Sequence, residues 1–80
     1  MNSISSIFQS DSEILGGQTV FTGTRVPVES FFYHLEKGIS IEEFLEDFPT
    51  VSREQAIGIL EIAEKVFSSK NIQSLYEAAA

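Results

Sequence analysis

Four polar side chains near one predicted turn are of the types that contact DNA. They are Thr50, Ser52, Arg53 and Gln55. Arginine can donate two hydrogen bonds to guanine, and glutamine can pair with adenine in the major groove. A helix is expected to end just before these residues and another to begin among them, which is the spacing of a helix-turn-helix unit. The alternative is an ordinary capped helix, and the neighbouring carboxylate of Glu54 would repel phosphate.

The net charge of the chain weakens the DNA interpretation. The formal charge is −7, whereas proteins that bind nucleic acid usually carry a basic excess, because neutralising phosphates supplies much of the affinity. Charge therefore favours a basic protein partner. DNA contact would need a small basic spot on a dimer.

An acidic cluster precedes the same turn. It contains Glu42, Glu43, Glu46 and Asp47. Such a cluster could dock a basic partner or mimic phosphate, or it could be a solvated helix face. Its oxygen ligands are not spaced like those of a calcium loop, so we expect no metal site.

Residues suited to catalysis are scarce. His34 is the single histidine and the chain has no cysteine. A general base needs a nucleophile within reach, and the serines stand at expected turns and caps, where they have a structural role. Neither a Gly-x-Ser-x-Gly elbow nor a phosphate-binding glycine loop is present. We expect no enzyme and no cofactor.

Three helices are predicted to position the residues of the helix-turn-helix unit and of the acidic cluster. The first runs over 27–37, and Gly38 ends it as a glycine at the residue after the C-cap. The second begins after Ser40 and stops before Pro49, because the residue before proline avoids the helical region. The third runs from Arg53 to Ser68 or Ser69. Two pairs, Ser40 with Glu43 and Ser52 with Gln55, have the spacing of a capping box.

A short β-hairpin is predicted ahead of the helices. Its strands are placed at 13–15 and 19–21, joined by Gly16 and Gly17, because a tight hairpin turn needs positive φ at its centre. Residues 1–12 form an N-terminal arm that either packs as an edge strand or frays. The expected fold is mainly α: a hairpin followed by a three-helix helix-turn-helix bundle, in a domain spanning 13–68.

The third helix is apolar over a wider sector than one surface helix needs. Next to the face that is expected to pack in the core lies a second apolar strip, which consists of Ile59, Ile62 and Val66. Either the hairpin covers it or it forms an interface, and we favour contact with a second copy or a partner. In the tail, residues 69–80, helical spacing recurs at Ile72, Leu75 and Tyr76. The tail either forms a short fourth helix or orders only on a partner.

The sequence also predicts a location. No apolar run approaches the roughly 18 residues of a membrane span, and the start lacks the basic segment of a signal peptide. The chain has no cysteine. We therefore expect a cytoplasmic protein without a membrane partner.

One motif resembles a known family. The run Gly23-Thr24-Arg25-Val26-Pro27, at its offset from Gly16-Gly17, resembles the bacterial domain-of-unknown-function family 433, whose members read Gly-Gly-x-Pro-x-x-x-Gly-Thr-Arg-Ile-Pro-Val. The likeness continues through 37–40, 48–49 and 52–56. Thr19 stands where the family pattern has proline, which loosens the turn slightly.

The resemblance implies a homeodomain-like fold that is often dimeric. It also implies an antitoxin, which neutralises a PIN-like nuclease toxin by direct binding and contacts operator DNA as a homodimer. We expect the toxin to bind through the tail or the acidic face. The alternative is a dimeric adaptor that binds proteins and has no DNA role.

Arg25, in the centre of the family motif, has two interpretations. Its guanidinium could tie the hairpin to a helix C-terminus or to Glu29 in a charge-assisted pair. Alternatively it meets phosphate or an acidic site on the toxin. The structural interpretation is the favoured one.

Overall fold

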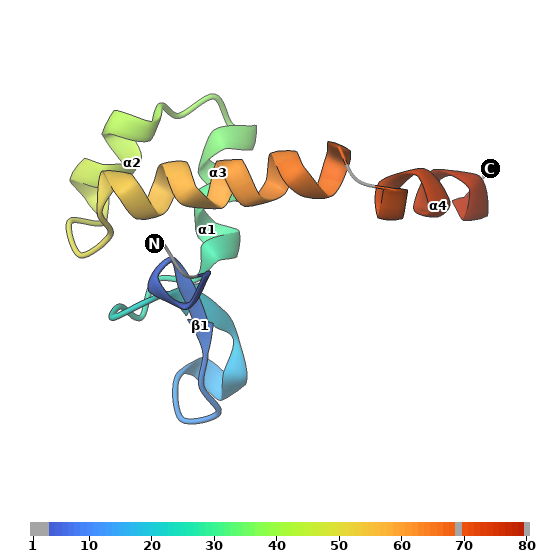
Figure 1. Ribbon diagram of the computed structural model, residues 1–80. Coiled ribbons are helices and arrows are strands. Elements are labelled where there is room, and N and C mark those ends of the chain that lie inside the picture. Colours follow the sequence, from blue (N-terminus) through green and yellow to red (C-terminus); the bar gives the residue numbers. More distant parts are fainter. Residues whose placement is uncertain (1–3, 69, 80) are drawn as a thin grey trace.

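The computed structural model describes residues 4–68 and 70–79, with side chains described for 4–68 and 73–79. A 3-10 turn, η1 (Ile4–Ser6), leads into strand β1 (Phe8–Ser10), a second 3-10 turn, η2 (Leu15–Gly17), and strand β2 (Thr19–Phe21). The helices follow: α1 (Val28–Glu36), α2 (Ile41–Asp47), α3 (Arg53–Ser68) and α4 (Lys70–Ala79). Figure 1 shows α3 crossing in front of α1, the hairpin below these two helices, and α4 extending past the end of α3. The predicted mainly α fold with an N-terminal hairpin and a fourth helix is confirmed.

The first strand of the hairpin differs from the prediction. Strand β1 pairs antiparallel with β2, so that Phe8 lies opposite Phe21 and Ser10 opposite Thr19. The prediction of a strand at 13–15 was therefore wrong, and the hairpin begins before residue 13, inside the predicted arm. The edge-strand alternative for the arm is the one that the structure adopts.

The backbone between the strands explains this difference. Leu15, Gly16 and Gly17 have φ values of 50°, 68° and 92°, which an extended strand cannot contain. The loop starts at Asp11, whose Oδ1 accepts a hydrogen bond from the backbone N–H of Glu13 at 2.9 Å, as in a turn initiated by aspartate. Gly16 and Gly17 do supply positive φ, but in the second half of a long loop.

The family motif forms a closed turn between β2 and α1. Thr24 is buried; its hydroxyl donates to the Phe21 carbonyl at 2.8 Å and accepts from the Val26 N–H at 3.0 Å. Gly23 has a φ of 78°, a conformation that other residues adopt at a cost. Pro27 has a ψ of 137° and so precedes the first helical residue instead of occupying it. The motif thus fixes how the chain enters α1.

The predicted helix boundaries and caps are confirmed to within a residue. At the end of α1, the Gly38 N–H donates to Leu35 and the Ile39 N–H to His34, both at 3.0 Å, which is a Schellman motif. Ser40 and Glu43 form the capping box of α2. No helix in the described ranges 4–68 and 70–79 is long and apolar enough to cross a membrane.

Three phenylalanine rings make the centre of the core. Phe21 from β2, Phe31 from α1 and Phe44 from α2 are fully buried, and their ring centroids lie 4.9–6.3 Å apart. Ala56 and Ile59 of α3 belong to the same cluster. Edge-on and tilted aromatic contacts of this kind stabilise a core beyond their buried area. The core therefore joins the hairpin to the first half of α3.

Gly58 lets the N-terminal arm approach α3 closely. A Cβ atom at this position would lie 2.6 Å from Cδ1 of Ile7, which is too short for any real contact. Glycine inside a helix destabilises it by about 0.5–1 kcal/mol relative to alanine, so the close packing of Ile7 accounts for its presence in the middle of α3.

Candidate functional site

Most of the residues predicted to contact DNA lie at the start of α3. Their polar groups make hydrogen bonds and an ion pair within the chain. The Ser52 hydroxyl accepts from the Gln55 N–H, and Gln55 Oε1 accepts from the Ser52 N–H, both at 3.0 Å. The Gln55 amide also donates to the carbonyls of Thr22 at 2.9 Å and Ser6 at 3.4 Å. Gln55 therefore ties the arm and the β2–α1 turn to α3, and its side-chain amide nitrogen and oxygen both make hydrogen bonds within the chain.

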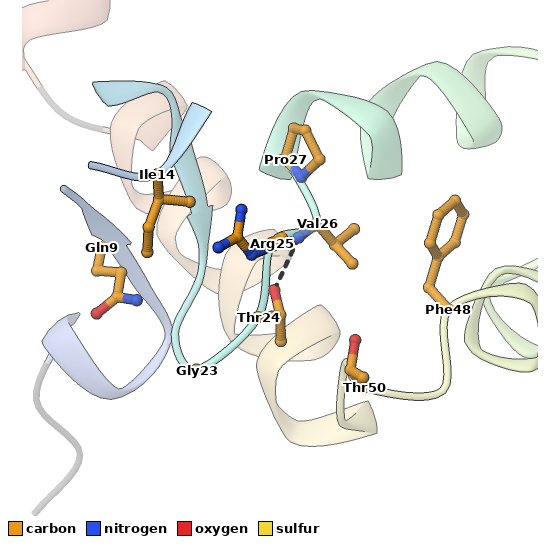
Figure 2. A pocket seen from close by; sticks show the side chains of 9 residues that line it. All are labelled: Gln9, Ile14, Gly23, Thr24, Arg25, Val26, Pro27, Phe48 and Thr50. Carbon is orange, nitrogen blue, oxygen red and sulfur yellow. Dashed lines mark hydrogen bonds between the residues drawn. The ribbon is translucent and has the colours of Figure 1, made fainter. Parts of the chain in front are cut away.

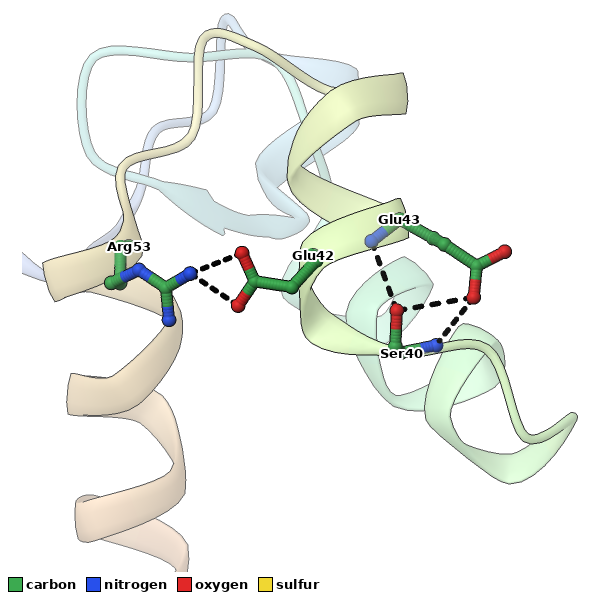
Figure 3. A network of polar contacts seen from close by, with 4 residues as sticks. All are labelled: Ser40, Glu42, Glu43 and Arg53. Carbon is green, nitrogen blue, oxygen red and sulfur yellow. Dashed lines mark hydrogen bonds and ion pairs between the residues drawn. The ribbon is translucent and has the colours of Figure 1, made fainter.

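Arg53 is paired as well. Its guanidinium contacts both carboxylate oxygens of Glu42 on α2, and the two side chains are 57% and 63% exposed (Figure 3). Thr50, in the turn between the two helices, is exposed. The four predicted DNA-contacting residues thus lie near one another, but the charge of the one arginine among them is balanced by Glu42.

A cavity of about 650 Å³ runs along α3 from its start to Lys65. It is lined by Ile4, Ser6, Ile7, Ser52, Glu54, Gln55, Gly58, Glu61, Ile62 and Lys65. Two carboxylates and one ammonium group give this lining a net negative charge, which would repel a phosphate backbone.

A second cavity, of about 570 Å³, lies at the family motif (Figure 2). We call it the Arg25 pocket; it is lined by Gln9, Ile14, Gly23, Thr24, Arg25, Val26, Pro27, Phe48 and Thr50. These residues come from β1, the hairpin loop, the turn before α1 and the turn between α2 and α3. Arg25 is the one charged residue in this lining.

The predicted pair of Arg25 with Glu29 is not formed. The Glu29 carboxylate instead accepts hydrogen bonds from the Gln18 amide at 3.4 Å and the Tyr33 hydroxyl at 3.3 Å. Arg25 precedes the first residue of α1, so helical spacing does not bring it towards Glu29. Its exposed guanidinium makes no ion pair or hydrogen bond with the part of the chain that the structure describes.

The end of α3 and the helix that follows expose large apolar side chains. Val66 is 51% exposed, Phe67 70%, Leu75 63% and Tyr76 74%. We call this region, residues 64–79 without residue 69, the α3–α4 extension. The side chain of Ile72, predicted to contact a partner, lies outside the described residues.

One residue of the predicted dimer strip belongs to the core. Ile59 is 5% exposed and packs in the cluster with Phe31 and Phe44, so its assignment to a dimer surface was wrong. The physical reason is that the buried face of α3 is centred on Ala56 and Ile59. Ile62 is half-buried and Val66 is exposed, so they remain on the surface.

The acidic cluster on α2 is exposed and partly engaged. Glu42 pairs with Arg53, and Glu43 Oε1 accepts from the Ser40 N–H at 3.3 Å in the capping box. Glu46 and Asp47 are exposed. Half of this face thus has a structural role, and the other half faces solvent.

His34 is packed as an ordinary helix residue. Its Nδ1 lies 2.7 Å from the Ser30 carbonyl oxygen, and its ring meets Phe44 and Phe48 edge-on. Within residues 4–68 and 70–79, no group of three or more His, Asp or Glu side chains could hold a metal ion.

Sequence reasoning missed Gln9 as part of a pocket and Gly58 as a contact point for Ile7. An isolated glycine inside a helical pattern is a signal of close packing, so Gly58 could have been found. Nothing local indicates Gln9, because its pocket is assembled from segments distant in the sequence.

The fold defines a small, mainly helical domain with an N-terminal hairpin, and its surface offers a pocket and an apolar helical extension. The family model described as "Protein of unknown function (DUF433)" matches residues 9–63. The chain belongs to this family. No curated protein and no solved structure matched the chain.

Proposed function

We propose that this chain is the antitoxin of a toxin–antitoxin pair and neutralises a PIN-like nuclease toxin by direct binding in the cytoplasm. The observation that carries the proposal is the exposed apolar surface of the α3–α4 extension. Phe67 and Tyr76 are at least 70% exposed. A partner that covered these two rings would remove from water most of their apolar surface, which the chain itself leaves exposed.

Charge complementarity supports the same kind of partner. A nuclease that cleaves RNA needs a basic groove, and a chain with a net charge of −7 would be attracted to it and steered during encounter. Glu46 and Asp47 on α2 are exposed for such a contact.

Capture of the toxin from the native host tests this function. The tagged full chain is expected to retrieve a nuclease-like protein, and Leu75→Asp is expected to reduce the amount captured by about tenfold or more, because it places a charge in the apolar contact. Ser74→Asp is the matched control, since helical spacing places it on another face of α4. Retrieval of no nuclease, or equal capture by Leu75→Asp, would argue against the proposal.

The second part of the proposed function is contact with operator DNA as a homodimer. Ile62 and Val66 would contribute to the dimer contact, and Thr50 and Arg53 would approach the DNA. A gel shift on the chain's own promoter, at stated salt and with and without the toxin, tests it. We expect any shift to be lost in Arg53→Ala.

A dimeric adaptor without a DNA role is the second candidate. Two observations favour it: the Gln55 amide is fully engaged within the chain, and Arg53 pairs with Glu42. Toxin capture with no promoter shift at low salt would select this candidate.

A further inference from the structure

The Arg25 pocket differs in charge from the rest of the molecule. The chain carries a net charge of −7, yet the lining of this pocket contains Arg25 and no acidic residue. The lining of the cavity along α3, by contrast, contains Glu54, Glu61 and Lys65. Of these two cavities, the Arg25 pocket is therefore the one whose lining attracts an anion.

Three side chains with donor groups line this pocket, and they come from separate parts of the chain. Arg25 contributes its guanidinium, Gln9 its side-chain amide and Thr50 its hydroxyl (Figure 2). Within the described residues, none of these three side chains makes a hydrogen bond. A planar guanidinium fits a carboxylate in a two-point contact, and Figure 2 shows the Arg25 guanidinium on the side of the turn where Gln9, with its amide donor, also lies.

The remaining lining is largely apolar. Ile14, Val26, Pro27 and Phe48 surround the donors. These apolar walls offer room for an apolar side chain next to the anion. A carboxylate in a peptide, with an apolar neighbour, matches both features.

We propose that the Arg25 pocket binds a carboxylate of a partner protein, either an aspartate or glutamate side chain or a free C-terminus. Nucleic acid fits less well, because a polyanion needs several cations along its path, and this lining supplies one. Figure 1 places the turn before α1 and the α3–α4 extension at opposite ends of α3, so binding here does not depend on the proposed apolar contact between that extension and a toxin.

The test is a titration of the full ¹⁵N-labelled chain with peptides, followed through the backbone amide signals of Gly23 to Val26 and Thr50. One capped peptide carries a glutamate between leucines, and its partner carries glutamine instead. A third ends in a free leucine carboxylate, and its partner is the amide. Inorganic phosphate and a short DNA duplex complete the set.

Saturable shifts at these amides are expected with a carboxylate peptide, at an apparent Kd about tenfold or more below that of its neutral partner. Arg25→Gln should abolish them, whereas Lys37→Gln, which removes an exposed cation elsewhere, should not. A response to one carboxylate peptide and not the other identifies the source. Equal binding of charged and neutral peptides, binding that survives Arg25→Gln, tighter binding of phosphate or duplex, or no saturable shift would each overturn the proposal.

Discussion

The two ends of α3 differ in how far their side chains are hydrogen-bonded or buried by the rest of the chain. At its start, Ser52 and Gln55 cap the helix, Gln55 reaches Thr22, and Ala56 and Ile59 lie in the core. At its end, Phe67 is 70% exposed. Surface residues that fill their own hydrogen bonds stabilise the fold, whereas exposed rings gain from a partner. Ser52 and Gln55, which were predicted to contact DNA, therefore stabilise the fold, whereas the exposed apolar residues at the end of the helix remain available to a partner.

The largest difference in stability is expected between variants of a buried and of an exposed apolar residue on α3. Ile59→Ala is expected to lower the free energy of unfolding by about 2–4 kcal/mol, because it leaves a cavity in the core. Phe67→Ala removes a larger side chain, yet it should change the free energy of unfolding of the chain alone by less than about 0.5 kcal/mol. Urea denaturation followed by circular dichroism measures both. Similar losses in the two variants would contradict the contrast.

A smaller effect should follow from removing the cap at the start of α3. Ser52→Ala is expected to lower the free energy of unfolding by about 1 kcal/mol, because the Gln55 N–H loses its acceptor. Ser68→Ala, in the last turn of the same helix, is the control and should have almost no effect. If Ser52→Ala is as stable as the parent chain, the cap does not hold the helix start.

Gly58 should show an effect that depends on Ile7. Alanine in place of a helix glycine usually stabilises by about 0.5–1 kcal/mol, but here the added methyl group would collide with Ile7. Gly58→Ala should therefore give no gain in the parent chain and the full gain in an Ile7→Ala background. A double-mutant cycle by urea denaturation measures the coupling, and additive effects would mean that Ile7 does not pack there.

The smallest effect is expected for the ion pair between α2 and α3. Arg53→Ala should lower the free energy of unfolding by less than about 0.5 kcal/mol, because Arg53 and Glu42 are both more than half exposed and solvent screens them. Glu42→Gln should give the same small change, and both should vanish at high salt. A loss above about 1 kcal/mol would give the pair a structural role.

Much of the fold could be predicted, because helix signals are local. The capping pairs and Gly38 act over three or four residues, so their effect is readable from spacing. The first strand could not be predicted in the same way. Apolar residues occur both at Phe8 and at Ile14, and pairing of Phe8 with Phe21 in the folded hairpin decides between them.

The candidate site was less predictable, because it depends on contacts between distant residues. The local pattern identified Ser52 and Gln55 as a capping pair, but not the contact from Gln55 to Thr22 that engages the remaining amide. In the same way, the sequence placed Arg25 four residues before Glu29, but only the tertiary structure shows that the two do not meet.

Gln55 also has a consequence for how the domain opens. Its amide bonds to carbonyls 33 and 49 residues away in the chain, and closing loops of that length costs conformational entropy before any contact repays it. These bonds can form only once the hairpin has docked on α3, so they add cooperativity to the unfolding of this chain of 80 residues. The amide protons of β1, of the turn between β2 and α1 and of the start of α3 should therefore exchange together, in one slow unfolding unit.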